Sequence, residues 1–180
     1  TPDREGDDWL WLATKLRLAQ DYLRYLAPRY DQAPQLRLRA EERTPVVVLG
    51  LIKVLGIGTR LGRAVIGAVL RLAEAGVPHN AYIEQFLKTQ AADVVLLSPL
   101  VDLGSPQLDY LKSARALGIK TALCVGSWDH LSSKSVIRIV PDRVIVWNET
   151  QRSEAVDLHG VPPEQVVVTG AQCYDQWFDR

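Results

Sequence analysis

Polar and aromatic side chains follow an apolar run at residues 125–134, which read VGSWDHLSSK. Asp129 and His130 are both residue types that can take a proton from an attacking hydroxyl group, which is general-base chemistry. The indole of Trp128 can form a flat apolar wall against a sugar ring. The pattern indicates a reactive loop, and the alternative is an ordinary polar turn in which Asp129 caps the chain.

The remaining polar residues of this segment can bind hydroxyl or phosphate groups of a ligand. A serine-rich stretch is also typical of a plain turn, so the segment alone leaves both interpretations open. These further candidate binding residues are Ser127, Ser132, Ser133 and Lys134.

Other strand-end loops add candidate binding residues. Ser98 and Asp102 precede the predicted helix over 105–118, and the free amides of a helix N-terminus favour anionic or hydroxyl-rich ligands. The alternative for Asp102 is a turn residue that bonds its own backbone. Glu149 is a weaker candidate, since a carboxylate in the first turn of a helix already suits the helix dipole. Gln172 follows the last predicted strand and completes the set.

Alternating strands and helices must position these loops. Short apolar runs bounded by polar residues predict buried parallel strands. Such a pattern is typical of a doubly wound α/β sheet, in which ligands sit beyond the carboxyl ends of the strands. The rule selects the loops at 98–105, 126–135, 148–152 and 170–175. The strands are predicted at 93–98, 120–125, 143–147 and 165–170, with helices over 105–118 and from Asn148 to Gly160.

The N-terminal half has the spacing of helices instead. An apolar stripe follows Asp7 and Asp8 and is stopped by Pro28. Further helices are predicted at 45–56, 59–75 and 79–90, with the alternative that VVVL at 46–49 is a strand. Segment 35–43 is predicted to be a short charged helix or a connector. We expect residues 1–90 to be a mainly helical segment of the same domain, 91–170 to be the parallel βαβ core, and 171–180 to begin a hinge.

Composition excludes several classes of function. The 180 residues carry 21 basic and 21 acidic side chains, so no concentrated basic face for nucleic acid is indicated. The two cysteines have no metal-ligand spacing, so we predict no metal site and a cytoplasmic location. The uninterrupted apolar run before Lys53 is shorter than the ~20 residues that span a bilayer.

Residues 36–71 carry an excess of positive charge in an apolar setting. A basic, apolar helix can lie on an anionic membrane surface, so we expect peripheral contact through 45–75 at the inner face of the plasma membrane. The alternative is a core helix with a few solvated arginines. The seven basic residues outnumber Glu41 and Glu42 by five, and they are Arg37, Arg39, Arg43, Lys53, Arg60, Arg63 and Arg71.

Residues 141–175, PDRVIVWNETQRSEAVDLHGVPPEQVVVTGAQCYD, resemble the end of the N-terminal domain of two-domain, GT-B-type glycosyltransferases and of the related UDP-N-acetylglucosamine 2-epimerases. In those families a strand introduced by Pro-Asp or Ala-Asp precedes a helix, Gly-Ile/Val-Pro, a second strand and a Gly-Asn-x-x-x-Asp hinge. Here the hinge reads GAQCYD, so Ala171 and Gln172 depart from the family form.

The loop GSWDHLSSK resembles the WHG-x-PLK segment of teichoic-acid-type glycerophosphotransferases, where a histidine is the base, and it corresponds to the HxEAG segment of the epimerases. In this chain Asp129 follows Trp128 and His130 comes one position later, so the base is not assigned between the two.

The resemblance implies a Rossmann-like, doubly wound α/β sheet with an N-terminal helical insertion. It implies the acceptor-binding half of a glycosyltransferase of bacterial surface-polysaccharide or glycolipid synthesis. A sugar or lipid-linked acceptor would receive a sugar from a nucleotide-sugar donor without a metal. The donor is expected on a C-terminal domain that this chain lacks, so we expect no cofactor on this chain and no turnover by it alone. The alternatives are a 2-epimerase-like enzyme and a non-catalytic Rossmann-like binding domain.

Overall fold

The computed structural model describes residues 7–54 and 60–177, and they form two compact units. The helical unit contains the chain up to Pro78 together with Leu103–Pro106. The sheet unit contains His79–Asp102 and the chain from Gln107 onward. The change from helices to sheet core was predicted after residue 90, whereas the division between the units falls at Pro78, so the helix that follows belongs with the sheet.

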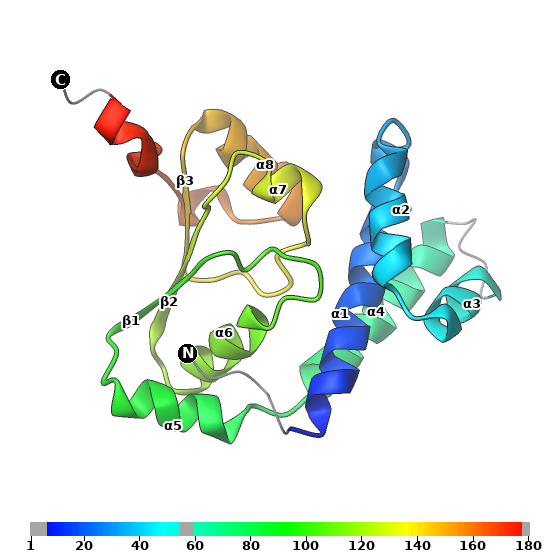
Figure 1. The fold of residues 1–180 in the computed structure, drawn as a ribbon, viewed down its shortest axis with the longest axis horizontal. Coiled ribbons are helices and arrows are strands. Elements are labelled where there is room, and N and C mark those ends of the chain that lie inside the picture. The colour runs from blue at the N-terminus through cyan, green and yellow to red at the C-terminus, as the bar shows by residue number, and fades with distance from the viewer. Residues whose placement is uncertain (1–6, 55–59, 178–180) are drawn as a thin grey trace. The chain divides into compact units, whose positions relative to one another are not determined.

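The helical unit consists of α1 (Trp9–Tyr25), the 3₁₀ helix η1 (Pro28–Tyr30), α2 (Pro34–Arg43), α3 (Val46–Val54) and α4 (Arg60–Gly76) (Figure 1). The predicted helices are confirmed, apart from residues 55–59, which lie outside the described residues. The strand alternative for residues 46–49 is wrong, because they lie in α3. The core of this unit joins α1 to α2 and α3 through Tyr22, Tyr25, Ala40 and Ile52.

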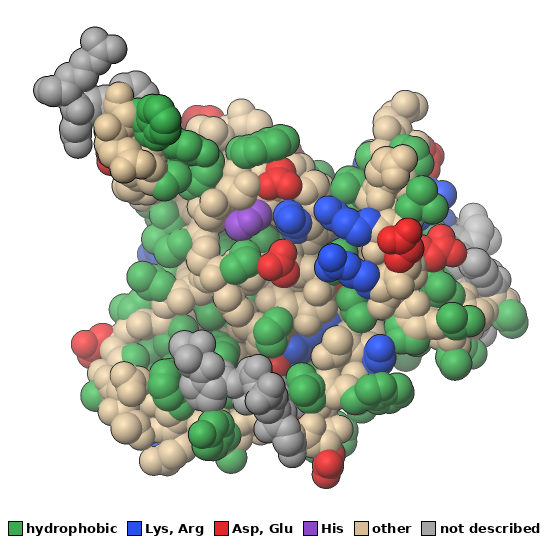
Figure 2. Space-filling model, in the orientation of Figure 1, with side chains coloured by type: hydrophobic (Ala, Val, Ile, Leu, Met, Phe, Trp, Pro, Cys, Tyr) green, Lys and Arg blue, Asp and Glu red, His purple; other side chains and the backbone are tan. Residues whose placement is uncertain are grey.

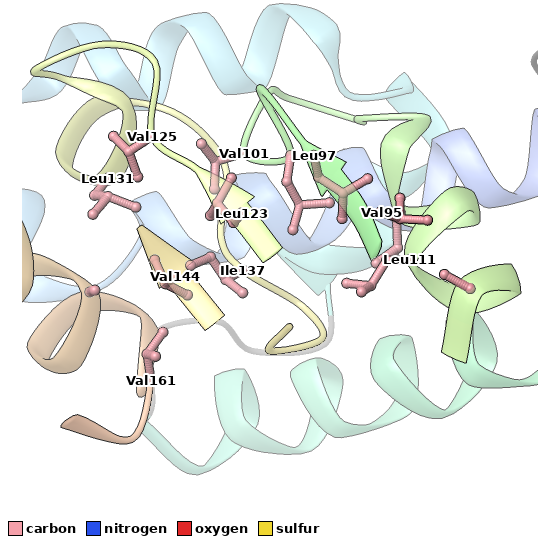
Figure 3. Packing of buried hydrophobic residues seen from close by; sticks show 14 of the residues in the cluster. Val95, Leu97, Val101, Leu111, Leu123, Val125, Leu131, Ile137, Val144 and Val161 are labelled. Atoms are coloured by element: carbon pink, nitrogen blue, oxygen red, sulfur yellow. The ribbon is translucent and has the colours of Figure 1, made fainter. Parts of the chain in front are cut away.

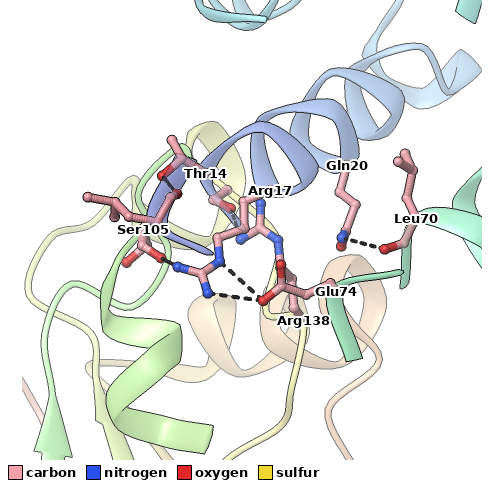
Figure 4. Close-up of polar contacts among 9 residues, drawn as sticks. Thr14, Arg17, Gln20, Leu70, Glu74, Ser105 and Arg138 are labelled. Atoms are coloured by element: carbon pink, nitrogen blue, oxygen red, sulfur yellow. Dashed lines mark hydrogen bonds and ion pairs between the residues drawn. The ribbon is translucent and has the colours of Figure 1, made fainter. Parts of the chain in front are cut away.

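A buried ion pair links α1 to α4 inside the helical unit. Arg17 is fully buried, and its Nη2 lies 3.0 Å from Oε1 of Glu74 (Figure 4). Arg17 Nη1 also donates to the carbonyl oxygen of Ser105 at 3.1 Å. The amide of Gly104 donates to Oδ2 of Asp21 at 3.0 Å. These bonds hold segment 103–106 against α1, and each buried charge has an opposite charge or a polar group beside it, as burial requires.

The sheet unit contains four parallel strands in the order β1-β2-β3-β4. The register of the three parallel pairs is set by Val94 opposite Lys120, Ala122 opposite Arg143, and Val144 opposite Val166. The predicted α/β, Rossmann-like class with a helical N-terminal region is confirmed. The doubly wound arrangement, which needs helices on both faces, is not seen among the described residues, because consecutive strands are neighbours in the sheet. The strands are β1 (Val94–Leu97), β2 (Lys120–Cys124), β3 (Arg143–Val146) and β4 (Val166–Val168).

The described helices of the sheet unit pack on one face of the sheet. The core on that face joins Val95, Leu123 and Val144 to helical residues such as Leu111 and Leu131 (Figure 3). Each strand is followed in the sheet by the next strand of the chain. Because crossovers between parallel strands are right-handed, all of these crossovers then lie on the same face of the sheet. The opposite face keeps apolar side chains exposed, Leu96 by 66%. The helices are α5 (Ala81–Thr89), α6 (Gln107–Ala116), α7 (His130–Ser133) and α8 (Glu149–His159).

Local signals in the sequence set the ends of these elements. The predicted N-cap Asn148 is confirmed, because its side chain accepts the amide of Gln151. Gly160 ends α8 at φ 69°, a left-handed conformation that favours glycine. Asn80 caps α5 in the same way as Asn148, through the amides of Tyr82 and Ile83.

Asp142 fastens the starts of β2 and β3 together. Its Oδ2 accepts the amide and the hydroxyl of Thr121, both at 2.9 Å, and Oδ1 lies 3.3 Å from Nζ of Lys120. Hydrogen bonds from Thr121, followed by the bond and charge of Lys120, lower the pKa of Asp142 to about 2. The ionised form therefore stabilises the pairing of the two strands.

We predict that D142N makes the free energy of unfolding depend less steeply on pH between about pH 4 and pH 2. Because the folded pKa lies below the unfolded value, this contribution is present above about pH 4 and is lost as pH falls toward 2. The effect should stay below about 1 kcal/mol, since a partly exposed ion pair is screened by water. Urea unfolding at several pH values measures it. The control D93N, at an exposed aspartate before β1, should keep the wild-type slope; equal slopes for all three proteins would contradict the assignment.

Candidate functional site

The carboxyl ends of β1 and β2 bring two predicted loops together. A β-carbon added at Gly126 would lie 3.1 Å from Oγ of Ser98 and 3.5 Å from Cε1 of His130. The amide of Ser135 donates to the carbonyl oxygen of Val101. Segments 98–102 and 126–135 are therefore neighbours at one edge of the sheet, as the strand-end rule predicted.

Asp129 organises the loop that follows β2. Its Oδ1 accepts the hydroxyl of Ser127 at 2.7 Å, and its Oδ2 accepts the hydroxyl of Ser133 at 2.8 Å. Bonds from Ser127 and then from Ser133 lower the pKa of the Asp129 carboxyl below its ordinary value. Asp129 is thus an ionised carboxylate held in one orientation.

His130 begins the short helix α7 beside this carboxylate. Its Nδ1 accepts the amide of Gly126 at 3.3 Å, so the neutral ring carries its proton on Nε2. Burial lowers the pKa of His130 by more than the charges of Asp129 and Asp102 raise it. At neutral pH the ring is therefore a neutral group with an Nε2–H donor, and the nitrogen with the lone pair is already engaged.

Gln151 joins the loops after β2 and β3, and it was not among the predicted site residues. Its side chain is buried, donates from Nε2 to the carbonyl oxygen of Ser127 at 3.1 Å, and accepts the amide of Trp147 on Oε1 at 2.8 Å. In a polar helical segment such as ETQRSE, a glutamine looks like a solvated surface residue. Its position in the first turn of a helix that follows a strand was the available signal.

His159, at the end of α8, contacts the second half of the segment that follows β2. Its Nδ1 accepts the amide of Ile137 at 3.0 Å, and its Nε2 lies 2.7 Å from the carbonyl oxygen of Leu131. Both bonds are satisfied by the ring with its proton on Nε2. The loop is therefore fixed to α8 at both ends, by Gln151 and by His159.

Several other predicted site residues lie around this pair. Trp128 has 73% of its surface exposed and is available to a ligand. Ser132 donates from Oγ to the carbonyl oxygen of Asp129 at 3.4 Å. The positive charge of Lys134 lowers the pKa of both Asp129 and His130, and the charge of Asp102 acts on His130. These residues share one electrostatic environment.

Glu149 and Gln172 are directed elsewhere. Glu149 has an exposed side chain whose Oε2 lies 3.4 Å from Nη1 of Arg152. Gln172 donates from Nε2 to the carbonyl oxygen of its neighbour Thr169 at 3.3 Å. In the part of the chain that the structure describes, no hydrogen bond joins either residue to segment 126–134. The fourth loop instead approaches the third through Tyr174, whose ring meets that of Trp147 edge-on at 5.7 Å.

Within residues 7–54 and 60–177, no group of histidine, cysteine, aspartate and glutamate side chains is arranged to hold a metal ion. No helix in the described ranges is both long and apolar enough to cross a membrane. Comparison with known proteins found no matching family model, no matching curated protein and no matching solved structure.

We predict that His130 titrates below the ordinary histidine value of 6.5, because burial disfavours its charged form. Proton NMR of the Cε1–H resonance across pH 4–8 measures the midpoint. The neighbours should move it in opposite directions: D102N should lower it further, and K134Q should raise it. A wild-type midpoint at or above 6.5 would show that the ring is not in the described environment.

We also predict that G126A displaces the Ser98 side chain by a few tenths of an ångström, because the added β-carbon would lie 3.1 Å from Oγ of Ser98, whereas its 3.5 Å distance from Cε1 of His130 is an ordinary contact. The cost in the free energy of unfolding should be about 1 kcal/mol, at the lower end of overpacking effects. Chemical denaturation of G126A, S98A and the double variant forms a cycle. Removing the Ser98 hydroxyl should reduce the cost of G126A, and strict additivity would show that the two residues are not in contact.

Proposed function

We propose that this chain is the acceptor-binding half of a nucleotide-sugar-dependent glycosyltransferase that acts in bacterial surface-polysaccharide or glycolipid synthesis. The observation that supports it most is the pairing of an oriented, ionised Asp129 with a neutral His130 at the carboxyl edge of a parallel sheet. This is the edge at which sheets of this kind bind ligands. The sequence resemblance supplies the reaction class, and the donor is proposed to lie on a second, nucleotide-binding domain.

The geometry favours Asp129 over His130 as the base. The Nδ1 lone pair of His130 is engaged by Gly126, whereas each carboxylate oxygen of Asp129 keeps a second lone pair beyond its serine bond. The acceptor hydroxyl would give its proton to Asp129 while its oxygen forms a bond to the anomeric carbon of the donor. The bond from that carbon to the nucleotide diphosphate breaks, and the diphosphate leaves with the electron pair.

The surrounding residues would orient the acceptor. The Nε2–H of His130 can donate to an acceptor oxygen, and the exposed indole of Trp128 can stack on a sugar ring. Lys134 brings a positive charge near Asp129 and can contact the phosphate of a lipid-linked acceptor. Fixing the acceptor oxygen against the base is the kind of orientation that accelerates a bimolecular reaction.

A cytoplasmic location is part of the proposal. Both cysteines in the described residues are free, Cys124 half-buried and Cys173 exposed, which suits a reducing compartment.

The decisive assay follows sugar transfer by the full-length protein from a panel of UDP-sugars to lipid-linked and soluble acceptors. We predict that D129N lowers kcat by about 10²–10⁴, the usual contribution of a general base, with a smaller change in KM. S133A should cost less, since Asp129 keeps its bond to Ser127. The matched control E149Q, at a carboxylate directed away from the site, should retain wild-type kcat.

Two outcomes would overturn the proposal. Isomerisation of UDP-N-acetylglucosamine without any acceptor would favour an epimerase. Full biological activity of a protein lacking both Asp129 and His130 would indicate a binding domain, in which Asp129 serves only to hold the turn.

A further inference from the structure

The helical unit exposes an unusual amount of apolar surface on α3 and α4. On α4 the side chains of Leu61, Val65, Val69 and Leu72 are exposed by 74%, 54%, 59% and 73%. Large apolar patches on a soluble protein mark interaction sites. Figure 2 shows hydrophobic side chains at the surface over α3, on the right of the view.

The exposed side chains of α4 form one continuous stripe. Their spacing of four, four and three residues keeps them on one side of a helix, and the stripe runs for about 16 Å along the axis. The opposite side of α4 packs inward through Ile66, Leu70 and Glu74. The helix is therefore fully occupied on its inner side, and its outer apolar side is not used by the described parts of the fold.

Positive charge borders this stripe, and negative charge is absent from it. Arg60 and Arg71 are both exposed and lie eleven residues apart, about three turns, on the same flank of the stripe. The single acidic residue of segment 45–76 is Glu74, which is buried against Arg17. The outer surface of α4 thus combines apolar side chains with uncompensated arginines.

We infer that α4 lies on an anionic lipid surface, with the stripe Leu61–Val65–Val69–Leu72 in the interface and Arg60 and Arg71 among the headgroups. An amphipathic helix with this combination binds in the plane of a membrane. A second copy of the chain fits less well, because its own α4 stripe offers no acidic side chain to the arginines. The inference does not rest on the proposed glycosyl transfer, and its test is independent of the test of that proposal.

Flotation of the full-length protein with vesicles tests the inference. Binding is expected to vesicles of phosphatidylcholine with 30% phosphatidylglycerol, and to be much weaker with phosphatidylcholine alone. Raising the salt from 0.1 to 0.5 M should weaken it, since salt screens attraction to the surface. V65S/V69S should lower the partition coefficient about tenfold or more by removing apolar contact. R60Q/R71Q should lower it by about 25-fold, near fivefold for each arginine.

Matched variants in the sheet unit distinguish lipid binding by the α4 stripe from non-specific binding through any exposed apolar or charged side chain. V94S/L96S removes two exposed apolar side chains from the open sheet face, and K88Q/R115Q removes two exposed charges from α5 and α6. Both should bind vesicles like the wild type, and unchanged circular dichroism confirms that all variants fold. Equal binding to neutral and anionic vesicles, or equal losses in the control variants, would overturn the inference. So would lipid-free self-association, seen by sedimentation, that V65S/V69S abolishes.

Discussion

The parallel pairing of β1 to β4 is the constraint on which the candidate site depends. Because all four strands run in the same direction, their carboxyl ends and the loops that follow them meet at one edge. Because consecutive strands are neighbours, the crossover helices pack on one face, and the buried halves of the strands join them in a single core. Asp142 secures the opposite edge, where β2 and β3 begin.

Side chains, rather than the sheet itself, hold the loops of the candidate site in place. Gln151 fixes both the start of the segment after β2 and the end of β3, and His159 contacts the carbonyl oxygen of Leu131 within α7. Asp129 then closes the turn through two serine hydroxyls. A site held in this way is preorganised, since its polar groups need little rearrangement when a ligand arrives. The same bonds explain why the polar-turn and reactive-loop interpretations of VGSWDHLSSK are not exclusive: Asp129 holds a turn and still presents a carboxylate.

Much of the fold could be predicted because its signals are local. Apolar runs bounded by polar residues marked every strand, and Asn148 and Gly160 marked the ends of α8. The convergence of Ser98, Asp102 and segment 126–134 followed from the strand-end rule. Contacts that depend on distant partners could not be predicted: Gln151 reads as a surface residue, the tautomer of His130 depends on the Gly126 amide, and Glu149 turns toward Arg152. Nor did the sequence indicate that Leu103–Pro106 packs with the helices, because that depends on the buried Arg17 and Asp21.

Hydrogen exchange at the Trp147 amide tests the central claim, that one buried side chain joins the two loops into a fixed site. This amide lies beyond the end of β3, and its hydrogen bond goes to Oε1 of Gln151. Exchange measured by NMR should be as slow as that of the Val125 amide, which bonds to Ile145 within the sheet. In Q151A the Trp147 amide should exchange at least tenfold faster while Val125 stays protected, and E149A should change neither. Rapid exchange at Trp147 in the wild-type protein would contradict the account.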